Sequence, residues 1–336
     1  MKDFAGVAVS PAIAGVLANS NLKNEIKTRH LLSIQDFKPD DMRKLVDTAV
    51  AFAAGEEVVR SSLSGTTVGI YFRRASTRTR TSFTVAAHRL GAKTIPYGPA
   101  DLQLITGETV EDTARVLSGF LKALVIRTND SLSEMRLFAK QEKMSVINAM
   151  SDNEHPTQAI ADLATIRETL GRLNDVHVLY LGEGNNTTAS LAFAMAMIPG
   201  MRLTIVTPAG YGIPNTDLET AQVIARESGA VIEQHHRIDR LPRNVDVVYT
   251  TRWQTMGVPK ADPDWMPKFR PYSVTPELMA KVSKPSGTIF LHDLPAVRGD
   301  DVVDEVLDGP QSKAFRQAEF KLFGAMAALC WCVGDL

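Results

Sequence analysis

Cysteine is almost absent from this chain, and charge of neither sign is in excess. The only cysteines, Cys330 and Cys332, lie near the C-terminus in an apolar helical pattern. This pattern favours reduced thiols in a cytoplasmic protein over a disulfide framework or a metal site. With 37 basic and 38 acidic residues the formal net charge is -1, so no global field draws the protein to nucleic acid or to an anionic membrane. Any basic site must therefore be local.

Long hydrophobic runs are also missing. The N-terminal stretch, residues 1–26, is mildly apolar, but Lys2 stands beside Asp3 and Pro11 interrupts the pattern. The stretch is a poor signal peptide and is too short to span a bilayer, so we expect an N-terminal extension and no membrane partner. A chain of 336 residues, 44% of them hydrophobic, is long enough to favour two domains over one.

Short apolar runs alternate with segments of helical period from about Thr66 onward. Continuous apolar strands separated by amphipathic helices are typical of parallel sheets covered on both faces. The predicted fold class is therefore α/β, with two domains, each a parallel sheet flanked by helices, and a C-terminal helix (311–333) that returns to the first domain. The predicted strands are 67–72, 124–128, 145–150, 177–182, 203–208, 246–251 and 288–294, and the clearest helical patterns are 81–90, 109–121, 157–170 and 218–228.

A polar break with a proline, SDNEHP at 151–156, separates the two predicted units. Such a segment is a natural hinge. We therefore expect a first domain formed by residues 27–153 together with 311–336, and a second formed by residues 154–310.

The stretch FRRASTRTRTSF (72–83) lies where a predicted strand passes into a predicted helix. Anions bind at such places because free backbone N–H groups and the helix dipole meet there. The stretch lacks the glycine spacing and the lysine of a nucleotide P-loop, so a small phosphate compound fits better than ATP. The alternative is a solvated helix start with surface arginines. The candidate phosphate ligands are the hydroxyls of Ser76, Thr77 and Thr79 and the guanidinium groups of Arg78 and Arg80.

Three more polar residues are predicted to meet this cradle. Arg127 stands at the end of another predicted strand, and His155 and Gln158 lie three residues apart at a helix start. If the strand ends converge, these side chains can donate hydrogen bonds to a carbonyl oxygen as negative charge develops on it. Taken alone, a histidine after a polar loop is more often a helix cap or a surface residue.

In their order along the chain, these motifs resemble those of the aspartate and ornithine carbamoyltransferases. The resemblance extends from about Lys27 to Leu329 and agrees with the fold predicted above. It implies a carbamoyl-phosphate domain and an acceptor domain, two small-molecule substrates (carbamoyl phosphate and an amine), no metal or organic cofactor, and a homotrimer with shared active sites. The motifs are STRTR (76–80), Arg127, HPTQ (155–158), HDLPAVRG (292–299) and FRQAEFKL (315–322).

The resemblance also assigns roles to single residues. It implies that the phosphate is held by Ser76, Thr77, Arg78 and Thr79, and that the carbamoyl oxygen is polarised by Arg127, His155 and Gln158. The backbone carbonyl of Leu294 would accept a hydrogen bond from the carbamoyl amide. Gln103 aligns with a glutamine that ornithine enzymes lend to the neighbouring subunit. Lys321 stands where those enzymes have an arginine near carbamoyl phosphate, so the charge is kept but the bidentate fork is lost.

The predicted acceptor site mixes two patterns. Ornithine enzymes share an Asp-x-Trp-x-Ser-Met-Gly segment and a His-Cys-Leu-Pro segment, which here read TRWQTMG (251–257) and HDLP (292–295). Thr251 thus replaces the aspartate and Asp293 replaces the cysteine, while Thr255 stands at the serine position and Met256 at the methionine position. The moved carboxylate, Asp293, is expected to attract an ammonium group or to orient the nucleophile, unless it is an ordinary cap at a strand end.

A second part of the pattern resembles the aspartate enzymes. Arg252 and Gln254, in TRWQ, match residues with which those enzymes hold an acceptor carboxylate. Asn186, however, matches an asparagine of the ornithine type, and Thr106 stands where aspartate enzymes have a catalytic lysine. The predicted acceptor is an ornithine-like amino acid. Aspartate and another amine of specialised metabolism remain alternatives.

Two other classes of function compete with carbamoyl transfer. The segment HVLYLGEGNN (177–186) has a strand followed by Gly-x-Gly, which suggests a dinucleotide-dependent oxidoreductase. The third glycine is missing, and no acidic residue ends the next strand, so this pattern is incomplete. A catalytically inactive carbamoyl-phosphate-binding subunit is the other alternative, although Arg127, His155 and Gln158 argue against it.

Overall fold

The computed structural model describes residues 28–56, 63–254, 259–334 and 336. Within them lie two sheets, of four and five strands, in the orders β2-β1-β3-β4 and β7-β6-β5-β8-β9. Every strand pair is parallel, which confirms the predicted α/β class. The strands are β1 (Thr67–Phe72), β2 (Lys93–Tyr97), β3 (Ala123–Arg127), β4 (Ser145–Met150), β5 (His177–Leu181), β6 (Arg202–Val206), β7 (Val231–His235), β8 (Val247–Thr250) and β9 (Ile289–His292).

Burial differs between the strands of the two sheets. Every residue of β3 and β4 is buried, because helices cover both faces of the first sheet. The edge strands β2 and β7 were not predicted. They consist of KTIPY and VIEQH, and most of their residues are exposed or half-buried, so neither contains the continuous apolar run by which the other strands were recognised.

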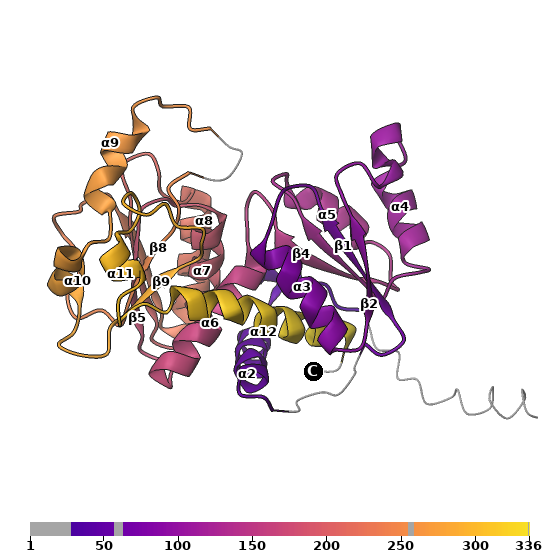
Figure 1. The fold of residues 1–336 in the computed structure, drawn as a ribbon, viewed down its shortest axis with the longest axis horizontal. Helices are drawn as coiled ribbons and strands as arrows, with labels where there is room; N and C mark the ends of the chain where they lie inside the picture. Colours follow the sequence, from indigo (N-terminus) through magenta and orange to yellow (C-terminus); the bar gives the residue numbers. More distant parts are fainter. Residues whose placement is uncertain (1–27, 57–62, 255–258, 335) are drawn as a thin grey trace, which may run out of the picture.

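Helix α12 (Ala314–Val333) joins the two lobes. It packs against α2, α3 and α6, and it also contacts β4 of the first sheet and β9 of the second. Figure 1 shows it crossing between the lobes, which confirms the predicted return of the last helix. The other helices are α2 (Pro39–Ala53), α3 (Arg78–Arg89), α4 (Val110–Leu117), α5 (Leu132–Phe138), α6 (Pro156–Leu170), α7 (Asn186–Ala196), α8 (Asn215–Ser228), α9 (Trp265–Phe269), α10 (Pro276–Val282) and α11 (Asp304–Leu307), with 3-10 turns η1 (Ile34–Asp36), η2 (Gln103–Thr106) and η3 (Arg270–Tyr272).

The polar segment SDNEHP connects β4 to α6. Helix α6 packs against α2 of the first lobe and α7 of the second. A domain boundary after residue 153 therefore falls at the start of a helix that both lobes share, and the boundary stays a prediction. The N-terminal extension lies outside the described residues.

Strand order places ligand sites at one position in each sheet. The order reverses between β1 and β3 in the first sheet and between β5 and β8 in the second. Ligands of open parallel sheets bind at the carboxyl ends of strands on either side of such a reversal. The segments that follow these four strands contain most of the predicted site residues.

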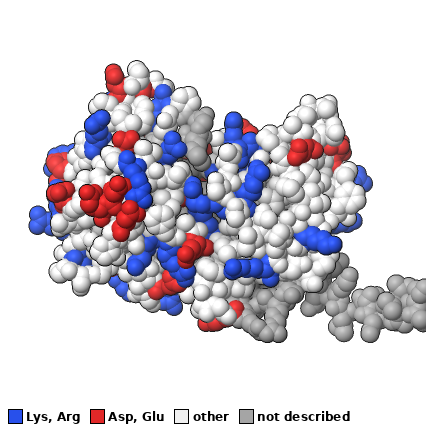
Figure 2. All heavy atoms as spheres, viewed as in Figure 1, with Lys and Arg blue, Asp and Glu red and all other residues white. Residues whose placement is uncertain are grey.

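Charged side chains are not evenly spread over the surface. On the face in Figure 2, Lys and Arg gather along the line where the lobes meet, and acidic residues cluster on the second lobe. In the described part of the chain, no helix combines the length and apolarity that a bilayer-spanning segment needs.

Candidate active site

A single cavity between the lobes brings together most of the residues predicted from the sequence. Its lining comes from the turn after β1, the ends of β3 and β4, the start of α6, the β5–α7 turn, the ends of β8 and β9, and α12. The predicted residues in it are Ser76, Thr77, Arg78, Thr79, Arg127, His155, Gln158, Asn186, Thr251, Arg252, Gln254, Asp293, Leu294 and Lys321.

The turn after β1 opens the cavity at the N-terminus of α3. Thr77 is the N-cap residue, and its side chain makes no capping hydrogen bond. The first N–H groups of α3 and the helix dipole thus favour an anion there. The four arginines of this stretch have different surroundings. Arg74 and Arg78 line the cavity, Arg73 pairs with Glu134 at 2.6 Å, and Arg80 contacts Phe72.

Arg80 does not fill its predicted role. It is absent from the described lining of the cavity, and its guanidinium lies 5.2 Å from the centre of the Phe72 ring. The Arg80 guanidinium thus stacks on the last side chain of β1 and does not line the cavity.

Arg127 reaches the cradle from the end of β3. Its Nη1 donates to the hydroxyl of Thr79 at 3.1 Å, and its side chain is buried. Burial and the neighbouring Arg78 lower the pKa of Arg127 to about 10, an effect that Asp293 opposes. The guanidinium is therefore cationic at neutral pH, with little water around it to screen the charge.

His155 is buried immediately before α6. The Ser190 hydroxyl on α7 accepts a hydrogen bond from its backbone N–H at 2.8 Å, which fixes the start of the helix. Burial, with the positive charges of Lys321 and Arg127, lowers the pKa of His155 well below 6.5. The imidazole is therefore neutral and can donate only one hydrogen bond to a ligand.

Gln158 has hydrogen-bond partners on both sides of its amide, and its predicted role toward the carbamoyl oxygen stays a prediction. Its Nε2 donates to Asp162 at 2.7 Å, and its Oε1 accepts from the ammonium of Lys321. Lys321 is itself buried, and this burial lowers its pKa, whereas the charges of Asp293 and Asp162 raise it. The amide thus directs its oxygen toward Lys321, and this geometry suits an acceptor better than a donor.

Asp293 follows β9 and lies at the acceptor side of the cavity. The Thr251 hydroxyl donates to its Oδ1 at 2.9 Å, and the Thr187 hydroxyl donates to its Oδ2 at 3.1 Å. Two hydroxyls from two different elements hold the carboxylate in one orientation. The carboxylate thus contacts side chains outside its own strand, and its role toward an acceptor stays a prediction.

The other predicted acceptor residues surround this carboxylate. Asn186 donates to the backbone oxygen of Ser151 at 2.6 Å, which ties α7 to the loop after β4. Arg252 and Gln254 line the cavity and are half-buried. Thr255 and Met256 lie outside the described residues.

Leu294 adopts an unusual backbone conformation. Its φ is 50°, a left-handed value that is uncommon for residues other than glycine. Its N–H donates to Nδ1 of His292 at 2.9 Å, so the N–H is occupied. Backbone strain of this kind is concentrated at functional sites.

Gln103 is exposed on η2 and does not belong to the described lining of the cavity. Its Oε1 accepts from the Thr106 hydroxyl at 2.8 Å. Its predicted role is in a neighbouring subunit, and it stays a prediction.

Sequence reasoning missed several residues that line the cavity. Most are next to a predicted site residue or at a strand end, and Arg74 and Asn129 lie two residues after the ends of β1 and β3. Extending every motif by one residue at each strand end would have found most of them. They are Arg74, Ala75, Asn129, Met150, Asn185, Thr187 and Pro295.

The Gly-x-Gly turn after β5 has a packing role. A Cβ on Gly184 would lie 2.3 Å from the backbone nitrogen of Ile213. The space above this glycine is thus filled by the loop after β6, where a dinucleotide pyrophosphate would have to approach.

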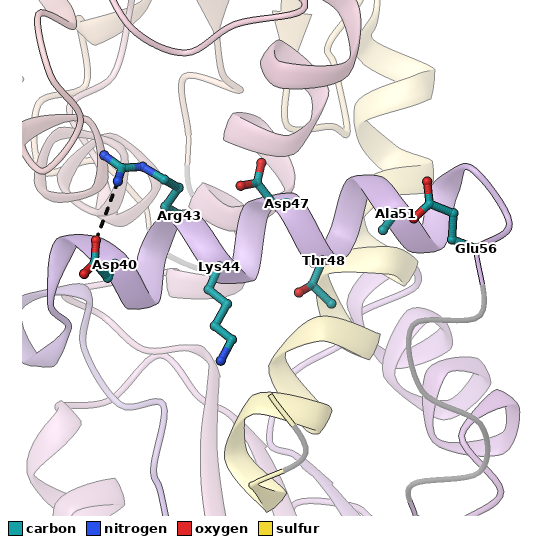
Figure 3. Close-up of a pocket in the computed structure, with 7 residues that line it drawn as sticks. All are labelled: Asp40, Arg43, Lys44, Asp47, Thr48, Ala51 and Glu56. Atoms are coloured by element: carbon teal, nitrogen blue, oxygen red, sulfur yellow. Dashed lines mark ion pairs between the residues drawn. The ribbon is translucent and has the colours of Figure 1, made fainter.

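A second hollow lies on the outer face of α2 (Figure 3). Arg43 pairs there with Asp40 at 3.6 Å, with side chains 47% and 95% exposed. Ion pairs between side chains as exposed as these contribute little to the stability of the fold. Figure 3 shows Lys44 directed away from Arg43, so the hollow is a solvated helix face without converging groups.

The fold and the cavity together define a group-transfer enzyme for a small anionic substrate. Residues 29–168 match the family model described as "Aspartate/ornithine carbamoyltransferase, carbamoyl-P binding domain", and residues 174–332 match the corresponding "Asp/Orn binding domain". The chain belongs to the aspartate/ornithine carbamoyltransferase family. It is a carbamoyltransferase, as the sequence motifs predicted.

Similar proteins agree with this assignment over nearly the whole chain. An ornithine carbamoyltransferase of Caldicellulosiruptor saccharolyticus is 41% identical over 92% of this chain and 100% of its own length. One from Methanothermobacter thermautotrophicus is 40% identical, with the same coverage of both chains. The solved structure of the Pyrococcus furiosus ornithine carbamoyltransferase superposes with a TM-score of 0.85 at 36% identity, covering 93% of this chain and 99% of that one.

Proposed function

We propose that the protein transfers the carbamoyl group of carbamoyl phosphate to the amino group of an ornithine-like amino acid and releases phosphate. The observation that carries this proposal is Asp293, the one carboxylate among the described residues that line the cavity. A carboxylate held by two hydroxyls can bind or orient a substrate ammonium through a charge-assisted hydrogen bond. The printed names of the similar proteins support an ornithine-like acceptor.

Carbamoyl phosphate is bound at the N-terminus of α3. The phosphate oxygens accept from the first N–H groups of the helix and from the hydroxyls of Ser76, Thr77 and Thr79. Arg78 lines the same part of the cavity and neutralises the phosphate charge through two parallel hydrogen bonds. Lys321 adds a buried point charge from α12.

The reaction then needs orientation and charge stabilisation but no covalent intermediate. The amine nitrogen attacks the carbamoyl carbon, and Arg127 and neutral His155 donate to the oxygen that becomes negative. The C–N bond forms as the C–O bond to phosphate breaks. The phosphate leaves into the cradle and takes the proton from the attacking amine.

A second candidate acceptor has an acidic group. Arg252 lines the cavity, and its Nε is buried without a hydrogen-bond partner among the described residues. The described lining also contains five cationic side chains, namely Arg74, Arg78, Arg127, Arg252 and Lys321, against one carboxylate. This excess favours a dianionic carbamoyl phosphate together with an acceptor that has at least one carboxylate.

A panel of acceptors tests the proposal. Purified protein is incubated with carbamoyl phosphate and ornithine, shorter diamino acids, aspartate or glutamate, and released phosphate is measured. The proposal predicts phosphate release that depends on a diamino acid. Release with aspartate or glutamate alone would favour the acidic acceptor, and Arg252→Leu should then abolish it. Phosphate release that no amine increases would contradict carbamoyl transfer.

A trimer is the assembly that we propose, with Gln103 contributed to the adjacent subunit. The region near Gln103 exposes large apolar side chains: Ile105 is 65%, Val116 54% and Phe120 72% exposed. Exposed apolar groups that gather in this way are typical of interaction surfaces. Buried cysteines agree with the cytoplasmic location that we propose.

Mixed subunits test this arrangement. Gln103→Ala and Arg127→Ala chains, each inactive on its own, should regain activity when they are dissociated and reassembled together, because some interfaces then have both residues intact. The mass of the particle in solution should equal that of three chains. A monomeric mass, or no recovery in the mixture, would contradict the shared site.

A further inference from the structure

Asp162 is a fully buried carboxylate that is absent from the described lining of the cavity. It lies one helical turn after Gln158 on α6. Burial raises the pKa of its carboxyl, because a bare charge in the interior is unfavourable. The structure compensates with three donors: Gln158 Nε2 at 2.7 Å, Gln317 Nε2 at 2.6 Å and the Tyr249 hydroxyl at 3.1 Å.

The orientation of both glutamines follows from partners that can only donate. The backbone N–H of His292 donates to Oε1 of Gln317 at 2.9 Å, so the Gln317 NH2 must face Asp162. The ammonium of Lys321 donates to Oε1 of Gln158, so the Gln158 NH2 must face Asp162 as well. An ammonium has no acceptor capacity. Oδ1 of Asp162 therefore receives two donors and acts as an acceptor.

This arrangement determines what Gln158 presents to a substrate. Gln158 lines the cavity. Its NH2 donates to Asp162, and its oxygen accepts from Lys321 and has a second lone pair for a ligand. A carbamoyl group has one donor, its NH2, and the Gln158 oxygen is a matching acceptor. A reversed amide would bring two N–H groups together and leave both without an acceptor.

We propose that Asp162 is a positioning residue for carbamoyl transfer, which holds the Gln158 amide so that its oxygen accepts from the carbamoyl NH2. This inference rests on the proposed function, because it takes carbamoyl phosphate as the ligand of the cavity. The carboxylate receives donors from α6, α12 and β8, so elements of both lobes determine its position.

Binding of two isosteric ligands tests the proposal. Acetyl phosphate has a methyl group where carbamoyl phosphate has NH2, so it cannot donate to Gln158. The dissociation constants of both are measured by calorimetry for the wild type and for Asp162→Leu, which removes the acceptor. The preference for carbamoyl phosphate should fall by about 10-fold, the equivalent of one hydrogen bond. The dissociation constant of acetyl phosphate should change by less than about 2-fold.

Three further variants separate positioning from general damage. Asp162→Asn retains an oxygen for both glutamines if its NH2 faces the Tyr249 hydroxyl, so it should keep most of the preference. In a Gln158→Met background, Asp162→Leu should no longer change the preference. Thr165→Val, which removes another buried hydroxyl of α6 bonded only to the Ala161 oxygen at 2.7 Å, is the control and should leave it unchanged.

Several results would overturn the proposal. The first is that Asp162→Leu weakens the binding of both ligands equally. The second is that Asp162→Leu still changes the preference for carbamoyl phosphate in the Gln158→Met background. The third is that Asp162→Asn loses as much of this preference as Asp162→Leu.

If Asp162→Leu does not fold, the proposal is tested in the wild type by NMR, from the hydrogen exchange of the side-chain amide of Gln158. Its N–H groups should keep their slow hydrogen exchange when carbamoyl phosphate binds, and a loss of protection would contradict the inference. These experiments measure binding and not turnover. A protein without transfer activity would refute the proposed function, but the binding experiments would still test the role of Asp162.

Discussion

The two halves of the cavity are built differently. In the half that we assign to carbamoyl phosphate, formed by α3, β3, α6 and α12, the side chains of Arg127, His155, Gln158 and Lys321 are buried. The cradle at its mouth is more open, because Ser76 and Arg78 are half-buried and Thr77 is exposed. In the half that we assign to the acceptor, formed by the β5–α7 turn and the ends of β8 and β9, Thr251 is buried but Asn186, Arg252 and Gln254 are half-buried. The charge of a buried side chain acts on a substrate with little screening by water, whereas a half-buried side chain can be substituted without disturbing a core.

This difference explains where the chain departs from the patterns it resembles. The motifs around carbamoyl phosphate are retained except on α12, where Lys321 stands in place of an arginine and Phe320 in place of an asparagine. In the acceptor half, the carboxylate stands in the segment after β9 and not in the segment after β8. Thr251, which takes its place after β8, donates a hydrogen bond to it. Chemistry and acceptor choice are thus separable, and substitutions should affect one without the other.

Replacing Arg127 should produce the largest effect. Arg127→Ala removes a buried donor to the developing oxyanion and should lower kcat by about 100- to 1,000-fold. Initial rates at saturating carbamoyl phosphate and acceptor measure this loss. The control is Arg89→Ala, which removes an exposed arginine at the end of α3 and should keep full activity. Near-normal turnover in Arg127→Ala would show that the carbamoyl oxygen is bound elsewhere.

Replacing Asp293 should affect the acceptor far more than carbamoyl phosphate. Asp293→Asn keeps the size of the side chain but removes the charge that attracts an ammonium, so the acceptor KM should rise by about 10- to 100-fold. The dissociation constant of carbamoyl phosphate should stay equal or fall, since Asp293 opposes the positive charge of Arg78 and Arg127. Weaker binding of carbamoyl phosphate with an unchanged acceptor KM would show that Asp293 acts on carbamoyl phosphate and not on the acceptor.

Thr251 should have a smaller effect of the same kind. Thr251→Val keeps the shape of the side chain and removes one hydroxyl donor to Asp293, which corresponds to about a 5-fold rise in acceptor KM. Thr250→Val is the matched control, because the Thr250 hydroxyl donates to the backbone oxygen of Leu181 at 2.9 Å and does not contact Asp293. An effect equal to that of Asp293→Asn would mean that Thr251 itself binds the acceptor.

The sequence predicted the central elements because their patterns are local. The apolar runs of β1, β3 and β4 and the motif at 76–80 are recognisable without knowledge of the contacts they make. The edge strands β2 and β7 were missed because exposure allows polar residues in them. Asp162 and Gln317 could not be found in this way, because a buried hydrogen-bond network depends on packing between α6 and α12 and leaves no periodic pattern.

The protonation of His155 gives the smallest predicted change, and it sharpens the contrast between buried and exposed groups. An ordinary imidazole would be half-protonated near pH 6.5, but burial holds the pKa of His155 well below this value. Its NMR signals, assigned by their loss in His155→Gln, should therefore stay constant between pH 7.5 and 6.5. The unfolded chain does take up a proton in this range, so the free energy of unfolding should decrease as the pH falls below 6.5, and less so in His155→Gln. A titration of His155 near pH 6.5 would mean that water reaches the imidazole, and the carbamoyl-phosphate half would then resemble the acceptor half.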